Sequence, residues 1–179
     1  MKGYSLQKAQ NMLKINRKKS EDNMRDFEKI SFEQFKKDVV DDIDLYDEYR
    51  LPQRDSNSTA GYDIYLLEDL AIEPNEIKKI PTGIKSFFEK DEVLFLIVRS
   101  SMGFKYNIRL CNQVGVIDAD YYNNESNEGH MYVALQNEGT KDFVINKGDA
   151  YAQGIIIKYL TCGEENNQKR TGGIGSTNN

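Results

Sequence analysis

Short apolar segments separated by turn residues dominate the chain from residue 62 onward, and they restrict it to a β fold. Turn signals such as Thr82-Gly83 and Lys147-Gly148-Asp149 stand between these segments. The pattern predicts strands at 62–67, 77–80, 92–98, 112–117, 131–136, 142–146 and 151–160. Short strands at such regular spacing are typical of an all-β sandwich or barrel. A chain of 179 residues suits one domain of this kind.

The first fifty residues have a different composition. Residues 1–50 are charged and helix-prone, which predicts a partly helical extension. Ser31 and Gln34 have the spacing of a capping box, and the apolar side chains that follow lie near one helical face: Phe32, Phe35 and Val39. We expect this helix to pack on the β region and to end at the acidic run 41–44.

The end of the chain is rich in Gly, Ser and polar residues, a composition that predicts a flexible arm. The sequence therefore predicts an extension at 1–50, a β domain at 51–163 and a flexible C-terminal arm at 164–179.

Composition argues against several classes of protein. The formal net charge of −5 argues against a general nucleic-acid binder, because affinity for duplexes rests on clustered Lys and Arg. A local cationic pocket for a triphosphate remains compatible with that charge. The apolar runs 93–98 and 154–157 are far shorter than the about 20 residues that a membrane helix needs. With its polar, charged start, we expect a cytoplasmic (intracellular) protein that has no signal peptide and does not enter a membrane.

Side chains suited to nucleophilic chemistry are few. Cys111 and Cys162 form no CxxC pair, which favours two reduced cysteines. His130 is the only histidine, so any Ser-His or Cys-His mechanism would have to use it. Because His130 leads straight into a strand pattern, its position favours a structural or exposed role over catalysis.

Two segments carry side chains suited to chemistry on a phosphate. The segment 115–121, Gly-Val-Ile-Asp-Ala-Asp-Tyr, is an apolar strand that ends in two acids and an aromatic ring. A carboxylate such as Asp118 is a suitable base for water, although a strand that ends in a polar turn gives the same string. Arg99-Ser100-Ser101 follows a strongly apolar strand and could form an anion site, or an ordinary strand end with a surface arginine.

Three further motifs place these two segments in a longer pattern. They are Ala60-Gly61-Tyr62-Asp63-Ile64, Gly148-Asp149-Ala150-Tyr151-Ala152-Gln153 and Arg170-Thr171-Gly172-Gly173-Ile174-Gly175-Ser176-Thr177. The five motifs, in this order, resemble those of the trimeric dUTPase family over roughly residues 50–179. The resemblance implies a jelly-roll β-sandwich, a homotrimer with active sites shared between subunits, and hydrolysis of dUTP to dUMP and pyrophosphate. Mg²⁺ would assist the attack of water at the α-phosphorus.

The resemblance also implies a role for each motif residue. Asp118 would act as the base, Gln153 would contact the α-phosphate and water, and Tyr121 would stack beneath the deoxyribose, where its ring leaves no room for a ribose hydroxyl. Asp63 would hold Mg²⁺ through water. The remaining substrate contacts implied are Arg99, Ser100, Ser101, Asn112, Gly115, Val116, Ile117, Arg170, Gly172, Gly173, Ile174, Gly175, Ser176 and Thr177.

From the residues alone, a purely structural role remains open for two of these side chains. Asp63 could be a polar partner in an alternating strand, and Gln153 a buried amide that bonds within the sheet. The chain also departs from the family pattern. Ile174 stands where many members have an aromatic residue, Ala150 replaces a common arginine, and the polar loop 122–129 replaces a short turn.

Two other functions remain open from the sequence. One is a dCTP deaminase of the same fold, monofunctional or bifunctional. The other is a nucleotide-gated regulator that binds a protein partner through the extension or loop 122–129.

Overall fold

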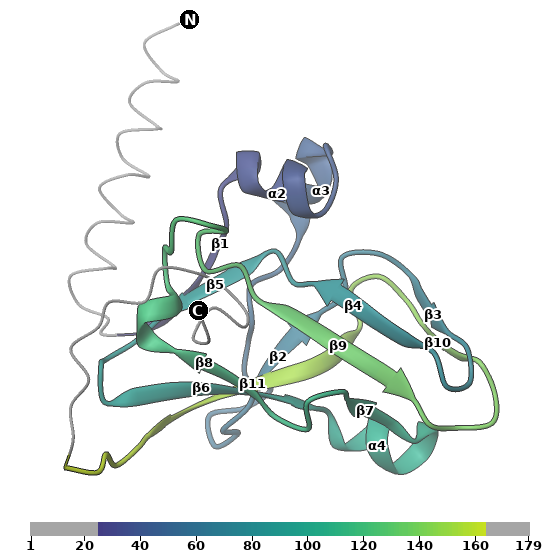
Figure 1. The fold of residues 1–179 in the computed structure, drawn as a ribbon. Coiled ribbons are helices and arrows are strands. Elements are labelled where there is room, and N and C mark those ends of the chain that lie inside the picture. Colours follow the sequence, from purple (N-terminus) through teal and green to yellow (C-terminus); the bar gives the residue numbers. More distant parts are fainter. Residues whose placement is uncertain (1–24, 164–179) are drawn as a thin grey trace, which may run out of the picture.

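The computed structural model describes residues 25–163, and antiparallel strands make up most of the regular secondary structure in this part of the chain (Figure 1). One sheet has the order β2 (Tyr62–Tyr65), β11 (Ala150–Lys158), β6 (Glu92–Val98), β8 (Gly115–Asp118). A second has the order β4 (Ile77–Pro81), β9 (Tyr132–Asn137), β7 (Ile108–Leu110). Two-stranded sheets pair β1 (Asp26–Lys29) with β5 (Ile84–Phe87) and β3 (Leu70–Ile72) with β10 (Phe143–Ile145). The predicted all-β class is confirmed.

The helices of the described residues are short. They are α2 (Phe32–Asp38), α3 (Ile43–Glu48), α4 (Ser100–Tyr106) and the 3-10 turn η1 (Ala119–Tyr121). In α2, Ser31 caps the helix as its spacing predicts, because its hydroxyl accepts a hydrogen bond from Gln34 N at 3.1 Å. None of these helices is long and apolar enough to cross a membrane.

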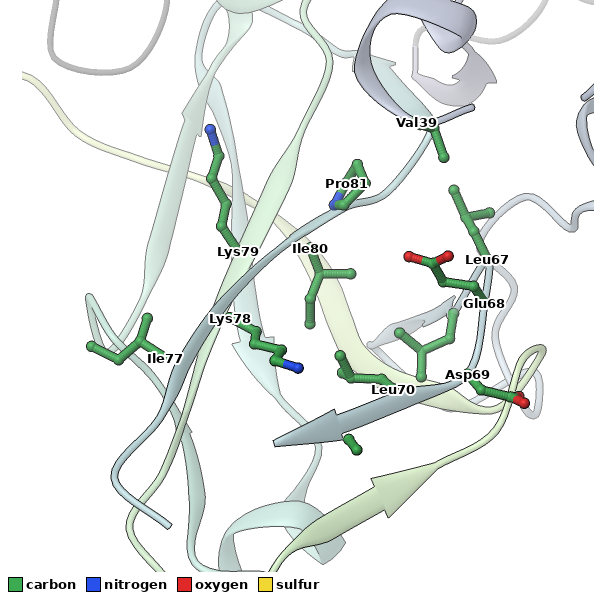
Figure 2. Close-up of a pocket in the computed structure, with 12 residues that line it drawn as sticks. Val39, Leu67, Glu68, Asp69, Leu70, Ile77, Lys78, Lys79, Ile80 and Pro81 are labelled. Atoms are coloured by element: carbon green, nitrogen blue, oxygen red, sulfur yellow. The ribbon is translucent and has the colours of Figure 1, made fainter. Parts of the chain in front are cut away.

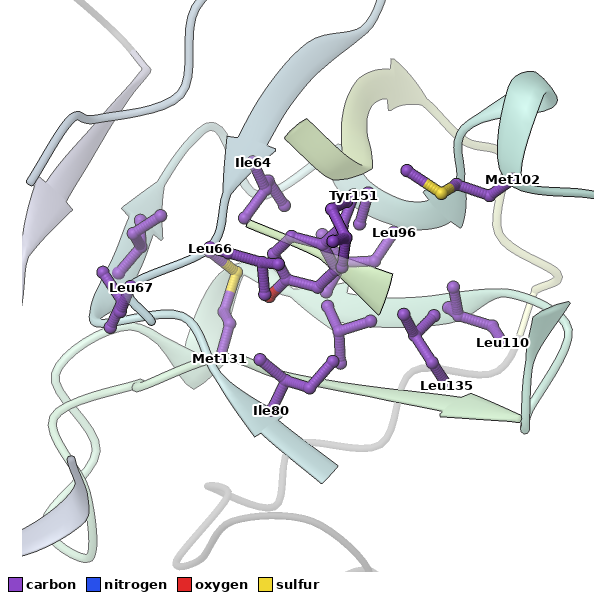
Figure 3. Packing of buried hydrophobic residues seen from close by; sticks show 14 of the residues in the cluster. Ile64, Leu66, Leu67, Ile80, Leu96, Met102, Leu110, Met131, Leu135 and Tyr151 are labelled. Carbon is purple, nitrogen blue, oxygen red and sulfur yellow. The ribbon is translucent and has the colours of Figure 1, made fainter. Parts of the chain in front are cut away.

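The core lies between the two larger sheets, because alternate residues of their strands point toward each other. Ile64 and Leu96 come from one sheet and Ile80 and Leu135 from the other, and they gather around Tyr151 (Figure 3). Each of these four aliphatic side chains is at most 7% exposed. Full burial of a side chain of this size contributes about 1.5–3 kcal/mol, so this layer is a main source of the stability of the fold.

Tyr151 occupies the centre of this apolar layer with a hydroxyl that has no hydrogen-bond partner among the described residues. The side chain is fully buried, and burial raises its pKa well above the usual value. Replacing Tyr151 by Phe removes a desolvated hydroxyl without changing the ring, so we expect Tyr151→Phe to raise the free energy of unfolding by about 1 kcal/mol. Urea unfolding with an unchanged m-value measures this. A loss of stability instead would mean that the hydroxyl has a partner.

Several predicted strands agree with the structure, and others need correction. The prediction at 92–98 coincides with β6, and 131–136 and 142–146 lie within one residue of β9 and β10 at each end. The prediction at 112–117 was wrong at its start. The strand begins at Gly115, because Gln113 has a φ of 63° and turns the chain between β7 and β8. Strands β1, β3, β5 and β7 were not predicted.

The acidic run 41–44 does not end the predicted helix. That helix already ends at Asp38, and Asp42 caps the next helix, α3, by accepting a hydrogen bond from Leu45 N at 3.0 Å. A carboxylate at the N-terminus of a helix is favoured by the helix dipole, so the run begins a helix.

His130 joins the N-terminal helices to the β sheets. It is fully buried, and its Nε2 accepts a hydrogen bond from Gly83 N at 2.9 Å, so Nδ1 carries the proton and donates to Asp38 at 2.7 Å. Burial lowers the pKa of His130, against the influence of Asp38. A neutral imidazole held at both nitrogens is structural, which is one of the roles that the sequence favours.

Candidate functional site

The Arg99-Ser100-Ser101 motif lies where β6 ends and α4 begins. Arg99 is the N-terminal cap residue of α4, and Ser100 and Ser101 form its first turn. The first N-H groups of a helix have no partner within the helix, and they attract anions. The structure thus places a guanidinium, two hydroxyls and the first backbone N-H groups of a helix at one end of β6.

Asp63 packs against this motif from strand β2. The residue is 6% exposed, and its Oδ1 lies 3.2 Å from Nε of Arg99. Nη2 of Arg99 also lies 3.6 Å from Oδ2 of Asp55. Burial raises the pKa of Asp63, the Arg99 charge opposes that shift, and Asp55 adds to it. The guanidinium therefore lies between two carboxylates. Asp55 was not predicted, because it stands in a polar turn with no motif around it.

Gln153 lies directly opposite Asp63 in the β2–β11 pair, so both side chains face the same side of the sheet. Gly61 makes room for it. A Cβ built on Gly61 would lie 2.2 Å from Oε1 of Gln153, so any side chain at this position would push the Gln153 amide aside. The glycine of this motif therefore lets the Gln153 amide lie against the backbone. The end of this sheet carries Asp63, Arg99 and Gln153 as one group.

Asp118 and Tyr121 lie at the other end of the same sheet. Asp118 is the last residue of β8, it pairs with Val93 at the start of β6, and it is exposed. Tyr121 closes the 3-10 turn η1 that follows, and it is only 4% exposed. Its hydroxyl donates a hydrogen bond to the carbonyl of His130 at 3.0 Å. The base and the ring predicted from one short string are thus neighbours in space.

The predicted base contacts surround Asp118 on the chain. Asn112 is exposed in the turn before β8, and its carbonyl accepts a hydrogen bond from Val114 N at 2.6 Å. Gly115 packs against Leu96, whose Cβ would be 3.0 Å from a Cβ added there. Val116 and Ile117 continue the strand, so these predicted residues form one hairpin edge that ends in Asp118.

The structure does not bring the two groups together within one chain. Arg99 and Asp118 are separated by six residues along β6, or about 20 Å at the rise of a strand. Asp118 and Gln153 lie on the same face of the sheet, but their Cα positions are about 16 Å apart. Side chains stand roughly perpendicular to a sheet, so this separation persists at the level of the functional groups.

An apolar sheet face lies between the two groups. Phe95 on β6 pairs with Ile155 on one side and with Val116 on the other, so the three side chains form a row across the sheet. Val116 is 57% exposed and Ile157, one row further along, is 40% exposed. Exposed aliphatic side chains that lie side by side on a sheet are unfavourable in water.

Two cavities among the described residues lie away from this sheet face. One, of about 390 Å³, lies between Val39, the segment 66–71 and strand β4 (Figure 2). The other, of about 440 Å³, is lined by β1 and its neighbours. No predicted site residue lines either of them. On the sheet face itself, Val116 and Asp118 are exposed.

The residues suited to hold a metal ion are few. No group of three or more His, Cys, Asp or Glu that could bind a metal occurs in residues 25–163. Asp63 and Asp55 are the two carboxylates beside Arg99. One or two carboxylates, with water and phosphate oxygens, are the usual ligands of Mg²⁺, so the donor set fits that ion when a triphosphate is present.

The predicted C-terminal contacts lie outside the described residues. They are Arg170, Gly172, Gly173, Ile174, Gly175, Ser176 and Thr177.

Comparisons with known proteins agree on one family. The sequence model of the dUTPase family matches residues 47–178. The deoxyuridine 5'-triphosphate nucleotidohydrolase of Lactococcus lactis subsp. lactis is 46% identical over 130 residues, which cover 71% of this chain and 87% of that protein.

Solved structures give the same result. The dUTPase from Streptococcus mutans is 36% identical and superposes with a TM-score of 0.63 over 77% of this chain and 98% of its own. A mutant dUTPase from phage phi11 of S. aureus, in which a structural Mg(II) ion was described, superposes with a TM-score of 0.59 over 80% of this chain and 96% of its own. At 21% identity, that second likeness concerns the fold alone.

Proposed function

The chain belongs to the dUTPase family and hydrolyses dUTP, and we propose that it does so by water attack at the α-phosphorus with Asp118 as the base. Its fold is the jelly roll of that family. The observation that carries the mechanism is the position of Asp118, which is exposed at the end of β8, with Tyr121 three residues further along in the turn η1.

The reaction needs an acceptor for the proton of the attacking water and a hydrogen-bond donor to the negatively charged oxygens of the α-phosphate. Asp118 accepts a proton from water as the water oxygen bonds to the α-phosphorus. The bond from that phosphorus to the oxygen that bridges to the β-phosphate breaks, and pyrophosphate leaves with the electron pair. Gln153 donates its amide N-H to an α-phosphate oxygen and orients the water.

Phosphate binding is assigned to the opposite end of β6. Arg99, Ser100 and Ser101 would contact the phosphate oxygens, since a guanidinium and the first turn of a helix both favour anions. Asp63 would hold Mg²⁺ through water, and the ion would offset charge on the triphosphate. The family match extends to residue 178, which supports further phosphate and base contacts from the C-terminal motif: Arg170, Gly172, Gly173, Ile174, Gly175, Ser176 and Thr177.

Selection of the substrate is assigned to the hairpin edge and to Tyr121. Asn112 and the backbone from Gly115 to Ile117 would pair with the edge of uracil, where cytosine presents the reversed pattern of donors and acceptors. The Tyr121 ring would lie against C2' of the sugar and exclude a ribose hydroxyl. A mispaired polar group in a closed site costs about 1–3 kcal/mol, which favours dUTP over its analogues.

We further propose a homotrimer whose active sites combine residues from neighbouring subunits. Two observations support it: Arg99 and Asp118 lie about 20 Å apart within one chain, and the exposed row around Val116 lies between them. A copy of the chain that covers this row would bring the base end of one subunit to the phosphate end of another. A cytoplasmic location belongs to the same proposal, since both Cys111 and Cys162 are free thiols.

Gly61 provides a test of the role of Gln153. A methyl group at Gly61 must displace the Gln153 amide, whose Oε1 would lie 2.2 Å away. We expect Gly61→Ala to lower kcat/KM for dUTP by about ten- to a hundredfold, because small misplacements of a positioning group are costly in catalysis. Gly163→Ala is the control, since within residues 25–163 nothing lies within 4 Å of a Cβ there. Equal activity of the two variants would remove Gln153 from the mechanism.

Pyrophosphate release, measured with the standard dNTPs, dUTP and UTP, tests the function directly. We expect release from dUTP alone at low enzyme concentration. Ammonia release from dCTP would instead support the deaminase alternative, which the relatives named above do not favour.

A further inference from the structure

Loop 122–129 follows Tyr121 in the chain and forms hydrogen bonds with Ser31 at the start of the N-terminal helix α2. Helix α2 precedes residues 47–178, the part of the chain that matches the family. The loop begins directly after Tyr121 and ends directly before His130. Because both of its ends lie against Tyr121, contacts made by the loop bear on the position of that ring.

The phenol of Tyr121 is held by the far end of the loop. Its hydroxyl donates to the His130 carbonyl at 3.0 Å and accepts from Nδ2 of Asn127 at 2.9 Å. Its backbone carbonyl accepts from Nδ2 of Asn124 at 2.9 Å. Gly129 has a φ of +82°, and a Cβ there would lie 2.6 Å from the Tyr121 carbonyl oxygen. The loop therefore packs on the backbone of Tyr121 as well as on its ring.

The same loop is bound to the N-terminal residues through Glu128. One carboxylate oxygen accepts from Ser31 N at 2.9 Å, and the other accepts from the Ser31 hydroxyl at 2.5 Å. Lys85 lies 3.3 Å from the same carboxylate. Burial opposes the charge of Glu128, but the Ser31 hydrogen bonds and Lys85 outweigh it and lower the pKa. In a capping box, the side chain of the residue at the position of Gln34 would accept a hydrogen bond from Ser31 N. The Gln34 amide donates to Asp38 instead, and Glu128 accepts the hydrogen bond from Ser31 N.

Two more hydrogen bonds connect the ends of the loop to the N-terminal residues. The hydroxyl of Tyr122 donates to Glu28 at 2.7 Å, and Nδ1 of His130 donates to Asp38 at 2.7 Å. Glu128 itself has a φ of 58°, a strained value for a residue with a side chain, and such strain persists where surrounding contacts fix it. The first, seventh and ninth residues after Tyr121 are thus each bound to the segment 28–38.

We propose that residues 28–38 act, through loop 122–129, as a brace that positions Tyr121 against the sugar of the substrate. Ser31 and Glu128 are positioning residues: they touch neither substrate nor reacting atoms, and they restrain the ring that excludes a ribose hydroxyl. This inference rests on the proposed function, which assigns the sugar contact to Tyr121. It predicts that a change on α2 alters the choice between dUTP and UTP.

The test is the ratio of kcat/KM for dUTP to that for UTP in the full-length protein, with UTP assayed at high enzyme concentration. Loss of folded protein lowers both values equally, so a purely structural role leaves the ratio unchanged. We expect Ser31→Ala and Glu128→Gln to lower the ratio by about tenfold, since a loosened ring discriminates less well.

Two control variants separate the brace from general weakening of the helix. Ser31→Thr keeps the hydroxyl and should keep the ratio within about twofold of the wild type. Glu33→Gln removes the pair that Glu33 makes with Lys36 on the same helix, 2.9 Å apart, without touching the loop, and should also leave the ratio unchanged.

Tyr121→Leu, measured alongside, tells a failure of the brace from a failure of the proposed sugar contact. If Tyr121→Leu lowers the ratio but Ser31→Ala and Glu128→Gln do not, the brace is wrong and the sugar contact stands. If Tyr121→Leu leaves the ratio unchanged, both are wrong.

Discussion

Asp118→Asn is expected to lower kcat for dUTP by about a thousandfold while the dissociation constant of the nucleotide stays within about tenfold of the wild type. The amide has the shape of the carboxylate and can still donate or accept one hydrogen bond. It cannot take a proton from water, so binding survives and the attack does not. Single-turnover kinetics, with equilibrium binding of a nonhydrolysable dUTP analogue, separates the two effects.

Asp120 is the matched comparison, because it is an exposed acid two residues further along in the same turn. The loss of turnover should be much larger in Asp118→Asn than in Asp120→Asn. The reverse order would show that the base has been assigned to the wrong acid of the Asp-Ala-Asp string. Similar, small losses in both would exclude a carboxylate base in this turn.

The strands that could be predicted are those whose signal is local. Strand β6 is a continuous apolar run bounded by polar residues, and its residues suffice to define it. Strand β1 has no such signal. It buries only Phe27, and its partner β5 lies about sixty residues away along the chain, so its existence depends on a pairing that no short window contains.

The same distinction holds for the candidate site. Asp118 and Tyr121 could be predicted together because they share one short string, and the string folds as one strand end and turn. Asp55 could not be predicted, since its closeness to Arg99 arises only when the turn before β2 folds against the end of β6. The contacts from loop 122–129 to α2 have no sequence signal either, because Glu128 and Ser31 are 97 residues apart.

The distance between Arg99 and Asp118 along β6 could not be predicted from the order of the motifs in the sequence. The motifs of Arg99 and Asp118 are close in sequence, yet the antiparallel pairing of β6 and β8 places them at opposite ends of one strand. Mixed trimers of Arg99→Gln and Asp118→Asn should therefore regain activity that neither variant has alone. Random exchange of equal amounts leaves about a quarter of the sites with an intact arginine from one subunit and an intact base from its neighbour.

A second mixture controls for any general effect of mixing. Arg99 and Asp63 lie 3.2 Å apart at the same end of the sheet, so both belong to whichever subunit supplies the phosphate half of a site. Trimers of Arg99→Gln mixed with Asp63→Asn then contain no site in which both residues are intact, and they should regain nothing. Native mass spectrometry establishes that the subunits have exchanged. Recovery in both mixtures would contradict the division of the site between subunits, and recovery in neither would mean that each chain completes its own site despite the separation along β6.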